Sequence, residues 1–187
     1  MKTFKELRKN LCSIRDELSV NAECNHSLAT RLRVALAEIE TGCIAVYWPI
    51  KSEFRAIDVA VEWANSPQKK LALPVVQINQ PLRFGLLDEN TPMHFGPQQI
   101  PEPILPSNAP GVIPDILIIP CLGWQSRNGQ KWRIGYGAGY YDRTLEHLRK
   151  LGLSTKTWGI SYKALEVNHE AWQPQAHDQP LDLVLTD

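Results

Sequence analysis

The sequence predicts an α/β fold, a three-layer αβα sandwich with a mostly parallel central sheet. Segments with helical spacing of apolar residues alternate with short apolar runs of strand length, an order typical of βαβ units. The run Ile116–Ile119 is apolar on both faces, as expected for a strand covered by helices on each side. The chain has 187 residues, which suits one domain over residues 1–187 whose core needs no disulfide support.

Three helices are expected in the N-terminal third of the chain. The first spans residues 4–18, where apolar side chains recur at helical spacing and leave a basic side. That side carries Lys5, Arg8, Lys9 and Arg15. The second helix is expected to begin near Asn25 or Ser27 and to stop at Gly42, because glycine suits the position after a helix end. The third spans residues 56–64, between expected strands at 43–48 and 71–76, as in a βαβ unit.

The rest of the chain is expected to complete the sheet. Eight prolines from Pro81 to Pro114 exclude long regular elements, so this region is predicted to be a short strand or hairpin, with a strand at 82–87, plus an extended crossing segment. Residues 115–122 are the predicted central strand, and Asn128-Gly129 marks a turn before an extended piece at 131–134. A helix at 140–151 ends at Gly152, and strands at 155–162 and 181–185 follow.

The composition excludes several classes of protein. Lys and Arg total 20 and Asp and Glu total 20, so no overall charge attracts nucleic acid or an anionic membrane, and we expect neither as a partner. The four cysteines lack zinc-site spacing, which favours free thiols in a cytoplasmic protein. The first residues do not form a secretory signal, and no run approaches the roughly 20 apolar residues that cross a bilayer. We expect small-molecule partners and a monomer, although no sequence feature fixes the oligomeric state.

The segment most informative about function is Arg133–Arg143, with the sequence Arg-Ile-Gly-Tyr-Gly-Ala-Gly-Tyr-Tyr-Asp-Arg. Alternating glycines allow positive φ and bring backbone N–H groups close to phosphate oxygens, and the helix that follows adds its positive N-terminal end. Asp142 falls in the first turn of that helix, where a carboxylate beside phosphates requires a cation between them. The segment therefore indicates a nucleotide bound with magnesium. The alternative is a tight loop that only packs a helix on a strand.

With its surroundings, this segment resembles the 5-formyltetrahydrofolate cyclo-ligase family, also called 5,10-methenyltetrahydrofolate synthetases. The resemblance extends over nearly the whole chain. It includes the basic first helix, Glu53 after the first strand, the Glu102-Pro103 pair, a strand ending in Pro120, the run Gly129–Arg143 and His177-Asp178. The resemblance implies a fold similar to that of ribose-phosphate isomerases and CoA transferases (NagB/RpiA/CoA transferase-like).

The resemblance also implies roles for individual residues. The ATP site would comprise Lys5, Arg8, Arg133, Ile134, Gly135, Tyr136, Gly137, Ala138, Gly139, Tyr140 and Tyr141. The substrate site would comprise Trp48, Glu53, Tyr136, Gly137, Ala138, Gly139 and Tyr140, and Mg²⁺ would be bound by Asp142 and Asp178. The chain departs from the family's Lys-x-x-x-Arg pattern, because Phe4 stands four residues before Arg8. The corresponding lysine is therefore either Lys5 or Lys2.

Each implied role has a structural alternative. Asp142 suits the N-terminal turn of a helix, Asp178 suits a turn, and basic residues on a first helix are most often solvated. A carboxylate at Glu53 can accept paired hydrogen bonds from the amino and ring N–H donors of a pterin. On sequence alone, Glu53 is also an ordinary acidic residue near the start of a helix.

The function that the resemblance implies is an ATP- and magnesium-dependent ring closure. An ATP-dependent carbon–nitrogen ligase would convert 5-formyltetrahydrofolate to 5,10-methenyltetrahydrofolate, with release of ADP and phosphate. The formyl oxygen would be phosphorylated, and N10 would close the ring. Two alternatives use the same fold: a noncatalytic nucleotide- or RNA-binding module, and an enzyme acting on a sugar phosphate or CoA ester.

Overall fold

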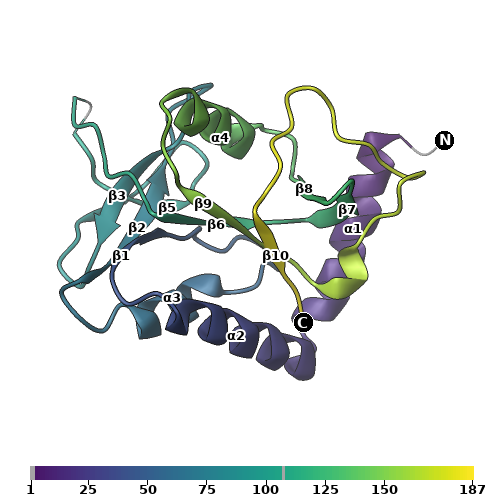
Figure 1. Cartoon of the computed structure of the whole chain (residues 1–187), viewed down its shortest axis with the longest axis horizontal. Helices are drawn as coiled ribbons and strands as arrows, with labels where there is room; N and C mark the ends of the chain where they lie inside the picture. The colour runs from purple at the N-terminus through teal and green to yellow at the C-terminus, as the bar shows by residue number, and fades with distance from the viewer. Residues whose placement is uncertain (1–2, 107) are drawn as a thin grey trace.

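The structure is a computed structural model that describes residues 3–106 and 108–187. Six strands form the central sheet: β1 (Gly42–Ala45), β2 (Lys69–Val75), β3 (Arg83–Leu87), β6 (Ile116–Pro120), β9 (Lys156–Ile160) and β10 (Leu183–Leu185). Their order is β10-β9-β6-β1-β2-β3 (Figure 1). All neighbours are parallel except β3, which pairs antiparallel with β2 at one edge. The prediction of a mostly parallel sheet is confirmed.

Helices cover both faces of this sheet. The helices of the described residues are α1 (Phe4–Ser19), α2 (Ala22–Ala37), α3 (Ala56–Trp63) and α4 (Tyr140–Lys150), with a short 3-10 turn η1 (Lys163–Leu165). Figure 1 shows α2 and α3 on one face and α4 on the other. Alternate residues of β6 enter different cores: Ile118 packs on the side of α2 and α3, whereas Leu117 and Ile119 pack on the side of α4. The chain is therefore a three-layer αβα sandwich, as predicted.

Two small hairpins stand outside the main sheet. One pairs β4 (Met93–Phe95) with β5 (Pro101–Pro103), and the other pairs β7 (Gly123–Arg127) with β8 (Gln130–Ile134). The predicted turn Asn128-Gly129 connects the second hairpin, with φ of 51° and 76°, values typical of a two-residue hairpin turn. Strand β7 was not predicted. The proline-rich region holds β3, a hairpin and extended chain, as its prolines indicated.

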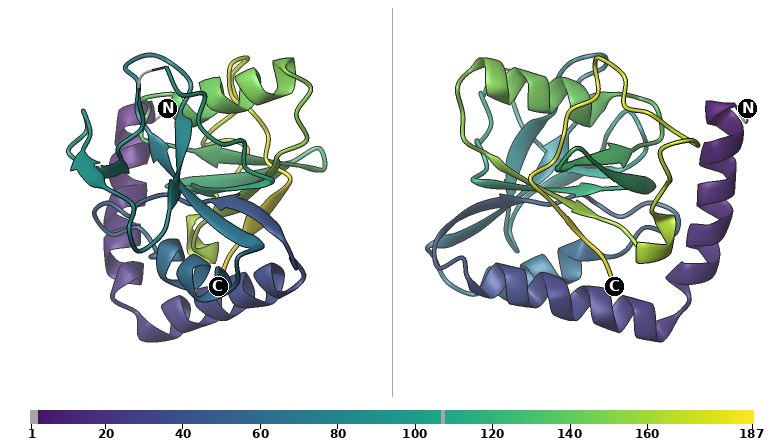
Figure 2. Two further views of the ribbon diagram at one scale, coloured as in Figure 1. Left: turned by 90° about the vertical axis from the view of Figure 1, so that its left-hand side faces the viewer. Right: turned by 45° about the vertical axis from the view of Figure 1, so that its right-hand side comes forward.

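Helix α1 stands at one end of the molecule beside β7 (Figures 1 and 2). Thr3 and Glu6 form a capping box at its start, which satisfies two backbone N–H groups. Leu11 packs so closely on Gly123 that a β-carbon there would lie 2.9 Å from the leucine Cδ1 atom. The sequence pattern places Arg15 on the basic side of this helix, away from the apolar stripe, but the residue is 2% exposed. Spacings of three and four residues put Leu11 and Arg15 on the same inward face as Arg8.

The bounds of the second helix differ from the prediction. It begins at Ala22, since the Asn21 side chain caps it by accepting hydrogen bonds from the N–H groups of Glu23 and Cys24 at 2.9 and 3.1 Å. It ends at Ala37, and Gly42 instead opens β1 with φ of 127°. All four cysteines are free thiols, as expected. Within residues 3–106 and 108–187, no helix combines the length and apolar character needed to cross a membrane.

Candidate active site

A cavity of about 910 Å³ lies where the carboxyl ends of β1, β2 and β6 meet. Its walls come from residues 47–53 after β1, from the end of β2, from Pro120 and Leu122 at the end of β6, and from residues 133–142. Strand β1 lies between β2 and β6, so the chain proceeds to one side after β1 and to the other after β6. Such switch points are where ligands bind in open parallel sheets.

Nearly all the predicted site residues line this cavity. They are Arg8, Trp48, Glu53, Arg133, Ile134, Gly135, Tyr136, Gly137, Ala138, Gly139, Tyr140, Tyr141, Asp142 and Asp178. Lys5 is not among the lining residues and its side chain is exposed. Lys2 lies outside the described residues. Phe4, which stands at the position of the family's lysine, lines the cavity itself.

The glycine segment has the backbone conformation that its sequence indicates at two of its three glycines. Gly137 and Gly139 have φ of 101° and 69°, values that favour glycine. Gly139 immediately precedes α4, and no side chain among the described residues caps that helix. The N–H groups of its first turn are therefore left for another acceptor, and the helix dipole favours an anion there.

Each glycine of this segment also makes room for an arginine. A β-carbon on Gly135, Gly137 or Gly139 would lie 2.6, 3.0 or 2.7 Å from a guanidinium nitrogen of Arg133, Arg8 or Arg143, respectively. Arg8 also donates a hydrogen bond from Nε to the Gly135 carbonyl oxygen at 3.0 Å. Alternating glycines thus allow three guanidinium groups to gather at one loop, and guanidinium groups match the oxygens of phosphates.

The two predicted metal ligands lie on the wall of the same cavity. Asp142 Oδ2 is 3.0 Å from Arg133 Nη2, and Asp178 accepts a hydrogen bond from the Gln175 N–H at 2.7 Å. Their side chains are 16% and 19% exposed. Across the described part of the chain, no three His, Cys, Asp or Glu residues gather as a metal centre. Both carboxylates line one cavity and offer oxygen atoms, the type of ligand that Mg²⁺ takes in proteins.

Glu53 is buried and lines the same cavity. Its Oε2 atom accepts a hydrogen bond from the Ile50 N–H at 2.9 Å, and its Oε1 atom lies 3.8 Å from Arg15 Nη1. Burial raises the pKa of Glu53 to about 7, although the Ile50 N–H and the Arg15 charge both act to lower it. The raised pKa means that Glu53 gains or loses its proton near neutral pH.

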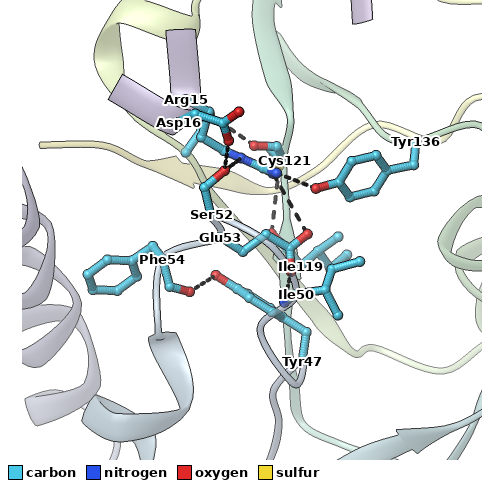
Figure 3. Close-up of polar contacts among 11 residues, drawn as sticks. Arg15, Asp16, Tyr47, Ile50, Ser52, Glu53, Phe54, Ile119, Cys121 and Tyr136 are labelled. Atoms are coloured by element: carbon cyan, nitrogen blue, oxygen red, sulfur yellow. Dashed lines mark hydrogen bonds and ion pairs between the residues drawn. The ribbon is translucent and has the colours of Figure 1, made fainter. Parts of the chain in front are cut away.

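Arg15 also belongs to this region, although its place in the sequence did not predict that. Figure 3 shows its guanidinium between Ser52, Glu53 and Tyr136. It donates from Nε to Ser52 Oγ at 3.1 Å and from Nη2 to the Tyr136 hydroxyl. Its Cζ atom lies 5.3 Å from the centre of the Tyr136 ring. Arg15 therefore ties α1 to the segment that carries Glu53 and to the glycine segment. Its position seven residues after Arg8, on one helix face, was the available sequence signal.

Comparison with known proteins agrees with this geometry. The sequence model of the 5-formyltetrahydrofolate cyclo-ligase family matches residues 1–187. The chain belongs to this family. A curated 5-formyltetrahydrofolate cyclo-ligase of Mycoplasma pneumoniae is 29% identical over 148 residues, which are 77% of this chain and 72% of that protein.

Solved structures from this family have the same fold. A 5,10-methenyltetrahydrofolate synthetase from Mycoplasma pneumoniae is 27% identical, with a TM-score of 0.69 over 96% of this chain and 95% of that one. The Aquifex aeolicus 5,10-methenyltetrahydrofolate synthetase is 24% identical, with a TM-score of 0.73 over 97% of this chain and 88% of that one. The cyclo-ligase resemblance and the αβα fold expected from the sequence are both confirmed.

Proposed function

We propose that the protein converts 5-formyltetrahydrofolate to 5,10-methenyltetrahydrofolate, coupled to the conversion of ATP to ADP and phosphate. The observation that carries the proposal is one cavity that combines a loop of glycines and guanidinium groups with a buried carboxylate and an aromatic wall. The loop suits a triphosphate. The wall, which includes Trp48 and Tyr136, suits a flat heteroaromatic ring.

The nucleotide end of the proposed site is the glycine segment with its arginines. Arg8 and Arg133 would contact phosphate oxygens and neutralise the charge that spreads over the transferred group. The uncapped first turn of α4 would add backbone N–H donors. Because Lys5 is exposed and away from the cavity, we assign the cationic role on α1 to Arg8.

Magnesium is part of the proposal through Asp142 and Asp178. When bound, Mg²⁺ would supply positive charge that neutralises the phosphates. Asp142 has a second task, since its carboxylate pairs with Arg133 at 3.0 Å and so holds that guanidinium at the glycine segment.

The folate end of the proposed site lies beside Trp48 and Glu53. The substrate's formyl oxygen, made nucleophilic by its amide-like nitrogen, attacks the γ-phosphorus of ATP, and the bond to ADP breaks. N10 then adds to the activated formyl carbon and loses its proton, and the carbon–oxygen bond breaks to release phosphate. The chain's residues align oxygen and phosphorus and keep water from the activated substrate.

The proposal includes one domain, residues 1–187, acting as a cytoplasmic monomer. The free cysteine thiols favour the cytoplasm. The residues named above all come from one chain and line one cavity, so the proposed site needs no second copy. The chain is an enzyme of this family and not a noncatalytic module, since the curated relative and the solved neighbours bear enzyme names.

A direct assay tests the proposed function. Methenyltetrahydrofolate absorbs in the near ultraviolet, where the formyl substrate does not, so product formation can be followed in a mixture of protein, 5-formyltetrahydrofolate, ATP and MgCl₂. We expect absorbance to grow only in the complete mixture. A flat trace, beside a known cyclo-ligase that is active in the same buffer, would overturn the proposal.

A further inference from the structure

A second buried carboxylate lines the cavity and has no part in the site described so far. Glu102 lies on β5 and is 1% exposed. Its Oε2 atom accepts a hydrogen bond from the Val76 N–H at 3.1 Å. Its Oε1 atom is buried and has no hydrogen-bond partner among the described residues. An unsatisfied carboxylate oxygen is unfavourable unless a ligand donor meets it.

The surrounding backbone holds this carboxylate in place. Val76 follows the end of β2, while Gly96 begins the turn between β4 and β5, where its N–H bonds to the Ile100 carbonyl at 2.9 Å. The Glu102 carboxylate packs on Gly96 so closely that a β-carbon at residue 96 would collide with it. Val76, Ile100 and Glu102 all line the cavity. The carboxyl group is therefore fixed on the cavity wall by two separate elements.

The two buried carboxylates of the cavity differ in their surroundings. Glu53 already has Arg15 and the Ile50 N–H beside its two oxygens. Glu102 makes no ion pair with a Lys or Arg of the described residues, and the nearby charge that acts on it is His94 of β4. Burial raises the pKa of Glu102, whereas the Val76 N–H and His94 lower it. Glu102 thus has spare acceptor capacity that Glu53 lacks.

We infer that Glu102 is a specificity-determining residue that accepts N–H donors from an amidine- or guanidine-like edge of the bound ligand. The inference rests on the proposed function, because the pterin ring of a folate carries such an edge in its 2-amino group and neighbouring ring N–H. The pterin edge would lie at the β2 and β4–β5 wall, and the reacting formyl group would lie toward Glu53 and the glycine segment.

Binding measurements with paired variants and paired ligands test this assignment. Isothermal titration calorimetry would compare Glu102→Gln with wild type for 5-formyltetrahydrofolate, for its 2-desamino analogue and for ATP with MgCl₂. Glutamine keeps an oxygen for the Val76 N–H but replaces the second acceptor by a donor. We expect the Kd for 5-formyltetrahydrofolate to rise about 10-fold or more, with little change for the desamino analogue or for ATP. Glu89→Gln, at an exposed acid between β3 and β4, should change none of the three.

A second variant displaces the same carboxylate without changing its chemistry. Gly96→Ala would displace the Glu102 side chain, and we expect the same selective loss of 5-formyltetrahydrofolate affinity. Equal losses for the formyl substrate and its desamino analogue, or no loss in either variant, would overturn the inference while leaving the proposed function standing. Wild-type protein that binds neither folate would overturn both.

Discussion

Two guanidinium groups, those of Arg15 and Arg133, are almost completely buried, and each has one carboxylate beside it. Arg15 is 3.8 Å from Glu53, and Arg133 is 3.0 Å from Asp142. Burial of a single charge is strongly unfavourable, so each buried guanidinium group requires the carboxylate beside it. The pairs also fix the directions of side chains that line the cavity. Individual substitutions at these residues therefore have separable effects on stability and on activity.

Loss of the Arg15 cation should destabilise the fold. In Arg15→Met, Glu53 loses its cationic neighbour while Ser52 and Tyr136 lose a hydrogen-bond donor, and we expect the free energy of unfolding to fall by about 3–5 kcal/mol. Urea denaturation would measure the change. Arg33→Met is the matched control on α2, because its ion pair with Glu62 is about half exposed and exposed pairs contribute little. Equal effects in both variants would contradict a structural role for Arg15.

The stability of the protein should depend on the Glu53 proton. Its pKa is about 7 in the native state and 4.5 ordinarily, so the native state holds the proton more tightly. The contribution of this group is complete below pH 4.5 and is lost as pH rises through 7, a change of about 3 kcal/mol. The unfolding free energy of wild type minus that of Glu53→Gln should therefore decrease from pH 4.5 to 8. A difference that stays constant with pH would refute the raised pKa.

Asp142 should matter to turnover more than to folding. Asp142→Asn keeps an oxygen for Arg133 but weakens a magnesium ligand, so we expect turnover to fall by about 100-fold and half-saturation to need more MgCl₂. The absorbance assay would measure both quantities. Glu146→Gln, an exposed substitution on the same helix, should leave them unchanged. Full activity of Asp142→Asn at low MgCl₂ would reject the metal role.

At the scale of the elements, the structure shows which features the sequence could predict. Strand β6 and helix α4 were predictable because their apolar patterns are strong and their ends carry Pro120 and Gly152. Strand β7 was missed because its buried Gln125 donates hydrogen bonds from Nε2 to distant carbonyl oxygens, those of Val167, Asn168 and Trp172, which no local pattern reveals.

Two other errors concern the start of α2 and the burial of Arg15. Residues that can cap a helix occur before α2 and also within it, where Asn25 and Ser27 were the expected start. The contact that decides among them is between the Asn21 side chain and two backbone N–H groups. Arg15 was placed on the basic side of its helix, and its burial was not predicted because its partners lie in segments far along the chain. The site's glycines were predictable as a backbone motif. The arginines that occupy the space beside them could be identified only from the fold.

The glycine segment should fail in a specific way when a side chain is added. Gly137→Ala would place a β-carbon 3.0 Å from Arg8 Nη1 at φ of 101°, which displaces the guanidinium and strains the backbone. Gly129→Ala is the control, because φ is 76° but nothing lies within 4 Å of the added carbon. Both variants should lose about 1–3 kcal/mol of stability. Calorimetry should show weaker ATP binding, by about 10-fold, in Gly137→Ala alone, and equal affinity in both variants would exclude a role of Gly137 in seating Arg8.

On the scale of the whole molecule, the cavity joins parts of the chain that are distant in sequence. Helix α1 contributes Phe4 and Arg8, the segment after β1 contributes Glu53, and the C-terminal part contributes Asp178. Helix α1 stands at the end of the sandwich rather than in either helix layer (Figure 2). A nucleotide at the glycine segment would therefore hold α1 against the sheet through Arg8.

This arrangement predicts where bound nucleotide will slow hydrogen exchange. Ligand that binds only the native state raises its stability, by about 2.7 kcal/mol at 100 times the Kd, but local openings are suppressed only where contacts form. With ATP and MgCl₂ we expect amide protection to rise most in α1 and in residues 134–142. Helix α2 supplies no residue to the cavity wall, so the smallest rise is expected there, and EDTA should reduce the gain in α4. Protection that leaves α1 unchanged would show that Arg8 does not bind the phosphates.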